Sequence, residues 1–309
     1  MITSVFKKST PINYTLVVIA VLCFFLIYQF KQPNWTDSLF TIAQKTGLLV
    51  IIVASFFLTN FIAKKNALTK DSSYSLLFFL LMLCFFPSVW DNYNLIISNF
   101  FILLASRRLV SLQTLKAPKE KIFDASLWIF IASLFHFWAI LFILLVYISI
   151  IFHVSRDYRN WLIPFVSFFF TSIVFVFYSL LIDKTAIDYY LSEQVINTGI
   201  DYFQNDFQNI ALSIFVVFVV FFGFSSVFTL TSKPLNMQAS YKKIIFSLLI
   251  GGVIYFISPN KNNDVLIFTF FSLAIMATNF IENSQNKIQQ EIVLAVSIIL
   301  SFFCFFSQL

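Results

Sequence analysis

Two acidic side chains, Asp37 and Asp91, are the candidate catalytic residues of this 309-residue sequence. Asp91 lies in the densest polar and aromatic patch, Pro87–Asn94, whose sequence is PSVWDNYN. A carboxylate in such a patch can accept a proton from an attacking hydroxyl or orient a donor group. Asp37 stands in a short polar segment, 31–40, which leaves little room for catalytic partners. The patch also has an ordinary explanation, since proline ends helices and Trp and Tyr anchor chains at a lipid–water boundary.

Two arginine pairs are candidate binding groups for lipid phosphate. Arg107 and Arg108 are adjacent, and Arg156 and Arg159 lie in a tight turn within residues 156–161, RDYRNW. A guanidinium presents several N–H donors in one plane and pairs well with phosphate. The alternative is that both pairs are basic turns that fix the orientation of the chain in a membrane, beside aromatic anchors.

Other kinds of site are not indicated. The two histidines, His136 and His153, and the three cysteines lack the spacing of metal ligands, so we expect no metal site and no disulfide framework. No nucleotide-binding loop or nucleophile motif occurs, and no cofactor is expected. The net charge of +6 does not predict nucleic-acid binding, because no soluble domain carries a basic face.

The candidate residues stand between apolar runs long enough to cross a membrane. Hydrophobic residues make up 60% of the chain, and the mean hydropathy is +0.89. A soluble protein of this length cannot bury so much apolar surface, whereas a bilayer solvates it. We therefore expect an all-α polytopic helical bundle. With roughly 20 apolar residues to a span, about eleven membrane segments are predicted, at 14–30, 46–63, 73–89, 93–106, 124–137, 139–154, 161–182, 208–230, 242–257, 264–281 and 291–307.

The run 124–154 decides the topology. It is too long for one upright helix and short for two, so it is either a hairpin or one tilted helix. With the N-terminus in the cytoplasm and a hairpin at this run, most lysines and arginines fall on the cytoplasmic side, as the positive-inside rule requires. A single crossing would move Arg156 and Arg159 outside. We therefore predict a hairpin, an uncleaved first span, the N-terminus inside and the C-terminus outside.

Two connections between the predicted spans stand out within the single transmembrane domain, 1–309. The inner segment 107–123 is basic and partly amphipathic, which suits an anionic cytoplasmic leaflet. The outer segment 183–207 has apolar residues at helical spacing, which predicts one or two amphipathic helices along the interface. Neither segment is long enough to form a soluble domain.

The chain resembles an uncharacterised family of Bacteroidota (Flavobacterium-type) inner-membrane proteins. The resemblance rests on residues 6–14 (FKKSTPINY), 123–125 (FDA) and 156–164 (RDYRNWLIP) and extends over nearly the whole chain. At 136–139 this chain has HFWA where the family favours Tyr-Phe-Pro-Ala, so a proline bend is missing here. The resemblance implies a multi-pass protein of the bacterial inner membrane. It also implies a distant analogy of fold to lipid-linked glycosyltransferases.

Two functions follow as expectations. The first is a non-enzymatic subunit of a cell-envelope assembly or transport complex, because the sequence shows no concentrated catalytic constellation and no soluble domain. Its partners would be the lipid bilayer and other membrane proteins. The alternative is a polyprenyl-phosphate-dependent glycosyltransferase or polymerase at the outer face, with Asp37 and Asp91 as its acids and a polyprenyl-linked glycan as its substrate. A transporter is disfavoured, since few polar residues lie inside the predicted spans.

Overall fold

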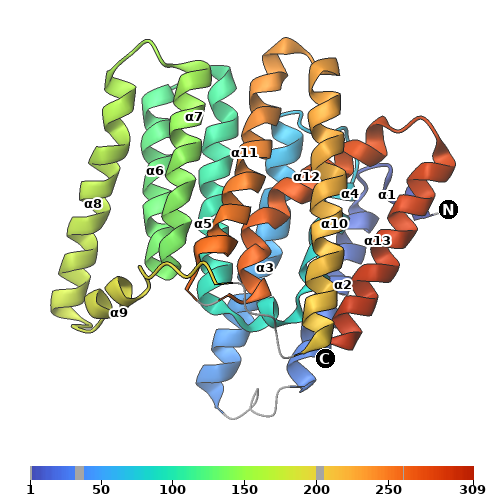
Figure 1. Ribbon diagram of the computed structural model, residues 1–309, viewed down its shortest axis with the longest axis horizontal. Coiled ribbons are helices and arrows are strands. Elements are labelled where there is room, and N and C mark those ends of the chain that lie inside the picture. The colour runs from blue at the N-terminus through green and yellow to red at the C-terminus, as the bar shows by residue number, and fades with distance from the viewer. Residues whose placement is uncertain (1, 32–37, 200–204, 260) are drawn as a thin grey trace.

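The described part of the chain, residues 2–31, 38–199, 205–259 and 261–309, folds into a bundle of helices without a strand in the computed structural model (Figure 1). The α-helices are α1 (Ile2–Phe6), α2 (Pro11–Lys31), α3 (Leu39–Lys65), α4 (Tyr74–Phe85), α5 (Tyr93–Val110), α6 (Pro118–Phe135), α7 (Ile143–His153), α8 (Arg159–Leu181), α9 (Ala186–Ser192), α10 (Asp206–Thr229), α11 (Leu235–Ile257), α12 (Ile267–Asn283) and α13 (Lys287–Ser307). Short 3-10 turns join them, namely η1 (Pro87–Asp91), η2 (Ser111–Thr114), η3 (Phe137–Phe142), η4 (Leu230–Ser232) and η5 (Asn263–Leu266).

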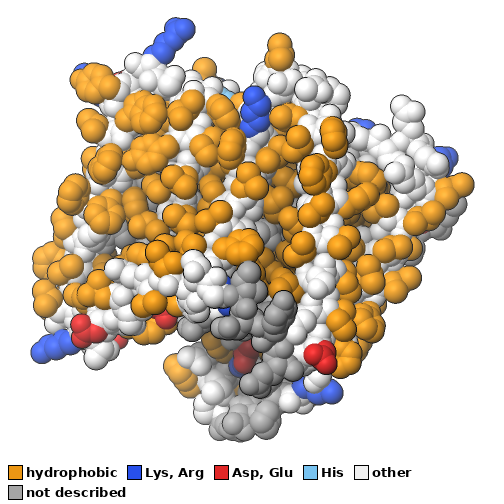
Figure 2. Space-filling model, viewed as in Figure 1, with side chains coloured by type: hydrophobic (Ala, Val, Ile, Leu, Met, Phe, Trp, Pro, Cys, Tyr) orange, Lys and Arg blue, Asp and Glu red, His pale blue; other side chains and the backbone are white. Residues whose placement is uncertain are grey.

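The fold is that of a helical membrane protein. Each of the predicted apolar segments overlaps one helix, and in the described part eight helical segments are long and apolar enough to cross a membrane. Figure 2 shows hydrophobic side chains covering the visible face, while charged side chains gather toward its upper and lower ends. This distribution is expected when the middle of the bundle lies in hydrocarbon. The count of about eleven segments and the cytoplasmic N-terminus stay predictions.

Two helices, α4 and α12, form the centre of the bundle. Every residue of α4 is buried, and α12 packs against it, with nearly all of its own side chains enclosed. A helix that is apolar on all sides is a core helix or a membrane span, and sequence alone does not separate the two. The 12 residues of α4 reach only about 18 Å, shorter than the roughly 30 Å of bilayer hydrocarbon. The other helices of the bundle, and not lipid, therefore surround α4.

The predicted hairpin of residues 124–154 is present. Helix α6 begins at Pro118 and ends at Phe135, where His136 takes an extended conformation. The chain then folds back through η3 and α7, which pack along α6 (Figure 1). The chain turns here although residues 136–139 contain no proline, because one extended residue is enough to end the helix.

The two connections singled out in the sequence are partly helical. The basic segment 107–123 contains the last turn of α5, the 3-10 turn η2 and the first turns of α6. The segment 183–207 contains the short helix α9, and residues 200–204 lie outside the described part.

A close helix crossing depends on Gly251 of α11. A Cβ atom added at Gly251 would lie 2.8 Å from Cγ2 of Thr269 and 3.0 Å from the carbonyl oxygen of Phe268, whereas one added at Gly252 meets nothing within 4 Å. Small residues let membrane helices approach closely.

We expect Gly251→Ala to destabilise the protein by about 1–3 kcal/mol through overpacking. Gly252→Ala is its matched control and is expected to stabilise by up to about 1 kcal/mol, because alanine is the better helix former. Thermal unfolding of both variants in one detergent measures the difference. Equal shifts in Tm would contradict a tight α11–α12 contact.

Candidate functional site

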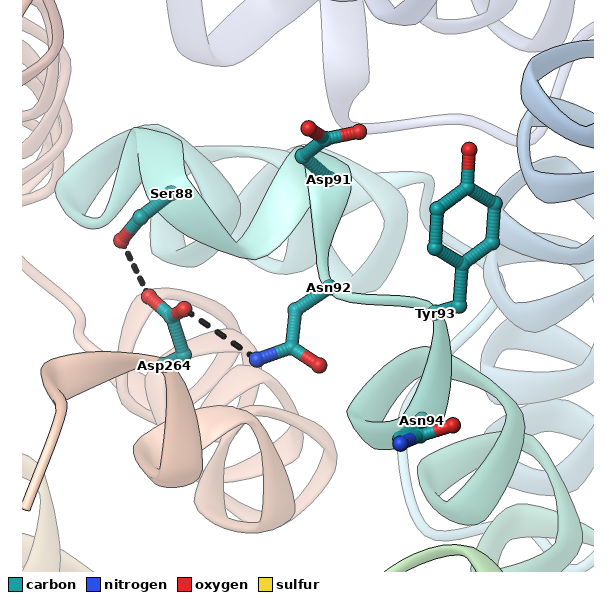
Figure 3. A pocket seen from close by; sticks show the side chains of 6 residues that line it. All are labelled: Ser88, Asp91, Asn92, Tyr93, Asn94 and Asp264. Atoms are coloured by element: carbon teal, nitrogen blue, oxygen red, sulfur yellow. Dashed lines mark hydrogen bonds between the residues drawn. The ribbon is translucent and has the colours of Figure 1, made fainter. Parts of the chain in front are cut away.

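Polar side chains from two distant parts of the chain line a cavity of about 370 Å³ at one end of the bundle. We call it the polar cleft, and its lining residues, drawn in Figure 3, are Ser88, Asp91, Asn92, Tyr93, Asn94 and Asp264. Five of them come from the segment that joins η1 to α5, and Asp264 comes from η5 at the start of α12. Asp91, the sequence-predicted acid, is therefore one of two carboxylates in this cavity.

Local sequence signals position the α5 side of the cleft. Pro87 occupies the first turn of η1, which suits its fixed φ and missing N–H. Asn92 then caps α5, and its Oδ1 accepts a hydrogen bond from the backbone N–H of Leu95 at 3.3 Å. Because the cap holds Oδ1, the amide Nδ2 of Asn92 points into the cleft and donates to Oδ2 of Asp264 at 3.4 Å (Figure 3).

Asp264 is the most deeply buried acid of the site, with 2% of its surface exposed. Its carboxylate accepts hydrogen bonds from the Ser88 hydroxyl, from Asn92, and from Nδ2 of Asn262 at 3.0 Å. These described donors are all neutral. A buried carboxylate without a paired cation is costly and is kept mainly where it has a task. Sequence reasoning placed Asp264 only among the acids of the outer face and missed it as a site residue.

Asp91 has a different environment. Its carboxylate forms an ion pair with Lys45 of α3 and remains one-third exposed. The Lys45 ammonium also lies 5.6 Å from the ring centre of Tyr93, which places a cation at the edge of the cleft. In Figure 3 the Asp91 carboxylate points away from Asp264, so the two acids face different parts of the cavity. Asp37, the other predicted acid, lies outside the described residues.

The four candidate arginines lie far from this cleft. Arg107 and Arg108 are in the last turn of α5, whereas the cleft is at its first residues. The 16 positions between Asp91 and Arg107 correspond to about 24 Å of helix. Arg107 stacks 5.0 Å over the ring of Phe61, and Arg108 forms an ion pair of 2.8 Å with Asp124. The structure therefore does not combine the arginines and the carboxylates in one site.

Arg156 and Arg159 belong to the turn between α7 and α8, at the same end as Arg108. The backbone N–H of Arg159 donates to Oδ1 of Asp157 at 3.0 Å and holds the pKa of that carboxyl below its usual value. Lys119 at the start of α6 also pairs with Asp157 at 3.3 Å. Such paired basic turns agree with a topological role, and lipid-phosphate binding by the four arginines stays a prediction.

A smaller cavity of about 190 Å³, which we call the side cavity, adjoins the polar cleft. It shares Asn92 and Asn94 with the cleft and adds His136 and Glu193. Nε2 of His136 lies 3.2 Å from the Ser258 hydroxyl, within hydrogen-bonding distance. The hairpin turn thus brings His136 to the site, as a hydrogen-bonding group. Among the described residues, no three His, Cys, Asp or Glu side chains gather as metal ligands.

The fold and site define a polytopic helical membrane protein with a polar cleft at one end of the bundle. The chain belongs to the DUF6427 family, described as a family of unknown function, which matches residues 3–309. No curated protein and no solved structure matches it. Membership of a family without an assigned activity, over the whole length of the chain, confirms that part of the resemblance noted in the sequence.

Proposed function

We propose that this protein is a non-enzymatic subunit of cell-envelope assembly or transport, whose polar cleft binds the head group of a lipid-linked molecule. The observation that carries the proposal is the buried carboxylate of Asp264, which opens on a cavity of about 370 Å³ beside amide and phenol groups. Carboxylates, amides and phenols together donate and accept hydrogen bonds, as the hydroxyl groups of a sugar-type head group require.

The hydrogen bonds of the two acids favour binding over catalysis. A general base must direct a free lone pair at the proton that it removes. Asp264 already accepts three hydrogen bonds, and Asp91 is paired with Lys45. With about four acceptor positions on a carboxylate, Asp264 retains room for one further donor, which a ligand hydroxyl can fill.

The surroundings of the bundle suit a subunit role. Large apolar side chains remain exposed along α8 and α10, for example Phe169 at 63% and Phe224 at 61%. Such surfaces contact lipid tails or the helices of other membrane proteins equally well. We place the protein in the bacterial inner membrane, with the N-terminus inside and the polar cleft at the outer face, because this orientation keeps the basic turns of α5–α6 and α7–α8 in the cytoplasm.

A polyprenyl-phosphate-dependent glycosyltransferase or polymerase is the second candidate. It is favoured by one observation, the presence of both Asp91 and Asp264 at a single cavity. In that mechanism Asp91, released from Lys45, removes the proton of an acceptor hydroxyl while Asp264 orients the sugar. The acceptor oxygen bonds to the anomeric carbon of the sugar, and the polyprenyl phosphate leaves with the electron pair of the broken carbon–oxygen bond.

Affinity purification from the native host in a gentle detergent, followed by mass spectrometry of proteins and lipids, tests the two functions. We expect stoichiometric membrane partners together with a co-purified glycolipid. A protein that comes alone and transfers sugar, and whose Asp91→Asn and Asp264→Asn variants do not, would support the transferase instead. If the purified protein carries neither membrane partners nor a glycolipid, both proposals are contradicted.

A further inference from the structure

A third cavity, much larger and mostly apolar, opens beside the site just described. It measures about 780 Å³ and lies between α6, α8 and α9. We call it the apolar groove, and it is lined chiefly by Phe101, Ile131, Phe135, Val174, Phe175 and Tyr190. Ligand pockets commonly measure roughly 300–1,000 Å³, so the groove has room for a substantial hydrocarbon group.

Helix α9 closes one end of the groove. The ring of Tyr190 lies 5.4 Å from that of Phe175 in α8 and 5.3 Å from that of Phe137 in η3. Through Tyr190, α9 thus contacts both α8 and η3, and it lies beside the lower end of α8 (Figure 1). The short helix in the segment 183–207 is therefore a wall of a cavity as well as an interfacial segment.

The carboxylate of Asp183, at the rim of the groove, already has hydrogen-bond donors within the protein. Oδ1 of Asp183 accepts hydrogen bonds from the hydroxyl of Thr185 at 2.6 Å and from its backbone N–H at 3.0 Å. The same two bonds lower the pKa of Asp183, so it stays ionised at the rim. The interior is left to aliphatic and aromatic side chains, which favour hydrocarbon over a polar ligand.

The groove is accessible from the bilayer. Val174 and Phe170 of α8, a helix long and apolar enough to cross a membrane, line the groove and are 53% and 54% exposed. A lipid chain can therefore enter sideways from the hydrocarbon layer without crossing water.

The groove and the polar cleft adjoin the same side cavity. The side cavity shares Phe135 and Tyr189 with the groove, and Asn92 and Asn94 with the cleft. The three adjoining cavities outline a path from an apolar chamber, past His136, to the carboxylate of Asp264. A molecule that fills this path must have a hydrocarbon chain at one end and a hydrogen-bonding head group at the other.

We infer that the apolar groove holds the hydrocarbon chain of the same lipid whose head group lies in the polar cleft. The inference rests on the proposed function for the head group and adds the chain-binding half of the site. The bound molecule is a lipid with a hydroxyl-rich head group, held at both ends, and Tyr189 and Phe135 contact the junction between them.

Photolabelling in lipid nanodiscs tests the chain-binding half. The probe is an alkyl glucoside with a diazirine near the end of its chain, and labelled peptides are mapped by mass spectrometry. Val174→Trp fills the groove, while Val176→Trp, the matched control, places the same side chain on α8 away from the groove. We expect labelling of the lining segments of α6 and α8 to fall about tenfold in Val174→Trp, as when about two methylene groups lose their burial, and to be unchanged in Val176→Trp.

If Val174→Trp folds poorly, Ala186→Trp in α9 fills the groove instead, and we expect the same loss of labelling. Labelling spread evenly over the exposed faces of α8 and α10, and insensitive to both groove variants, would overturn the inference. A photoreactive fatty alcohol without the sugar separates the two halves of the site. The head-group function of the cleft would be refuted if the fatty alcohol labels the groove as well as the glucoside does and Asp264→Asn changes the labelling by neither probe. That result would leave the chain-binding function of the groove in place.

Discussion

Asp264→Asn is expected to leave the protein folded and more stable by about 1 kcal/mol or more, while binding of an alkyl glucoside weakens about tenfold. The amide fits the existing hydrogen bonds. Its oxygen can accept from Asn92 and Asn262, which now share Oδ2, and its nitrogen can donate to the Ser88 oxygen. Removing a buried charge stabilises the fold, and the ligand loses a charged acceptor. Stability is measured by thermal unfolding, and affinity by titration in nanodiscs.

Asp264→Leu is the contrasting variant. It removes the acceptor that Ser88, Asn92 and Asn262 share. Asn262 is exposed and can turn to water, whereas the half-buried Ser88 and Asn92 each lose a partner at about 1 kcal/mol or more. Stability should therefore fall by about 2 kcal/mol or more. If the asparagine variant were destabilised as much as the leucine variant, the account of a carboxylate held by neutral donors would be wrong. A stabilised asparagine variant with undiminished affinity would show that the charge has no part in binding.

Lys243→Ala is expected to cost about 2–5 kcal/mol, because a long, fully buried side chain is truncated. Lys243 of α11 is 1% exposed, and its ammonium donates to the carbonyl of Leu109 in the last turn of α5 at 2.6 Å. It also lies 3.1 Å from Nε2 of His153, at the end of α7. A cation beside the last carbonyls of a helix is favourable, so Lys243 connects three helices at the end of the bundle opposite the polar cleft.

Two further variants separate packing from hydrogen bonding at this position. Lys243→Met keeps the aliphatic stem and should lose only the contribution of the ammonium, about 1–3 kcal/mol. The neighbouring Lys242 is less buried, and Lys242→Ala is expected to change stability by about 0.5 kcal/mol or less. Unfolding of all three variants in one detergent measures these costs. Equal losses for Lys242→Ala and Lys243→Ala would show that the buried ammonium does not connect the helices.

The apolar helices were readable from local signals, although α3, α6 and α11 begin six or seven residues before the predicted spans. Apolar runs predicted the helices, and the proline of the patch Pro87–Asn94 indicated the break between α4 and α5. The hairpin at His136 followed from the length of one apolar run and the positions of the basic turns. These features depend on residues close together in the chain, where steric preferences and the thickness of the bilayer limit the choices.

The sequence predicted only one side of the polar cleft, the side that contains Asp91. Asp91 and its patch, Pro87–Asn94, were singled out because polar residues cluster in one segment, but Asp264 meets Asn92 across 172 positions of the chain. No local pattern in residues 262–266 indicates that partner, since an asparagine-rich segment with one acid looks like an ordinary loop. The arginine pairs were predicted separately, as binding groups for lipid phosphate, and the length of α5 places Arg107 and Arg108 far from the acids.

By itself, the sequence determined that this protein is a bundle of apolar helices made for a bilayer, since composition and run length are sums over neighbouring residues. Only the tertiary structure decided which of those helices face lipid and which face protein. Apolar side chains predominate in both α4 and α8, yet α4 is buried and α8 is largely exposed. Lipid tails and helix interiors are similar solvents for a phenylalanine, so only the packing of distant helices distinguishes the two. The same packing brings the polar cleft and the apolar groove together.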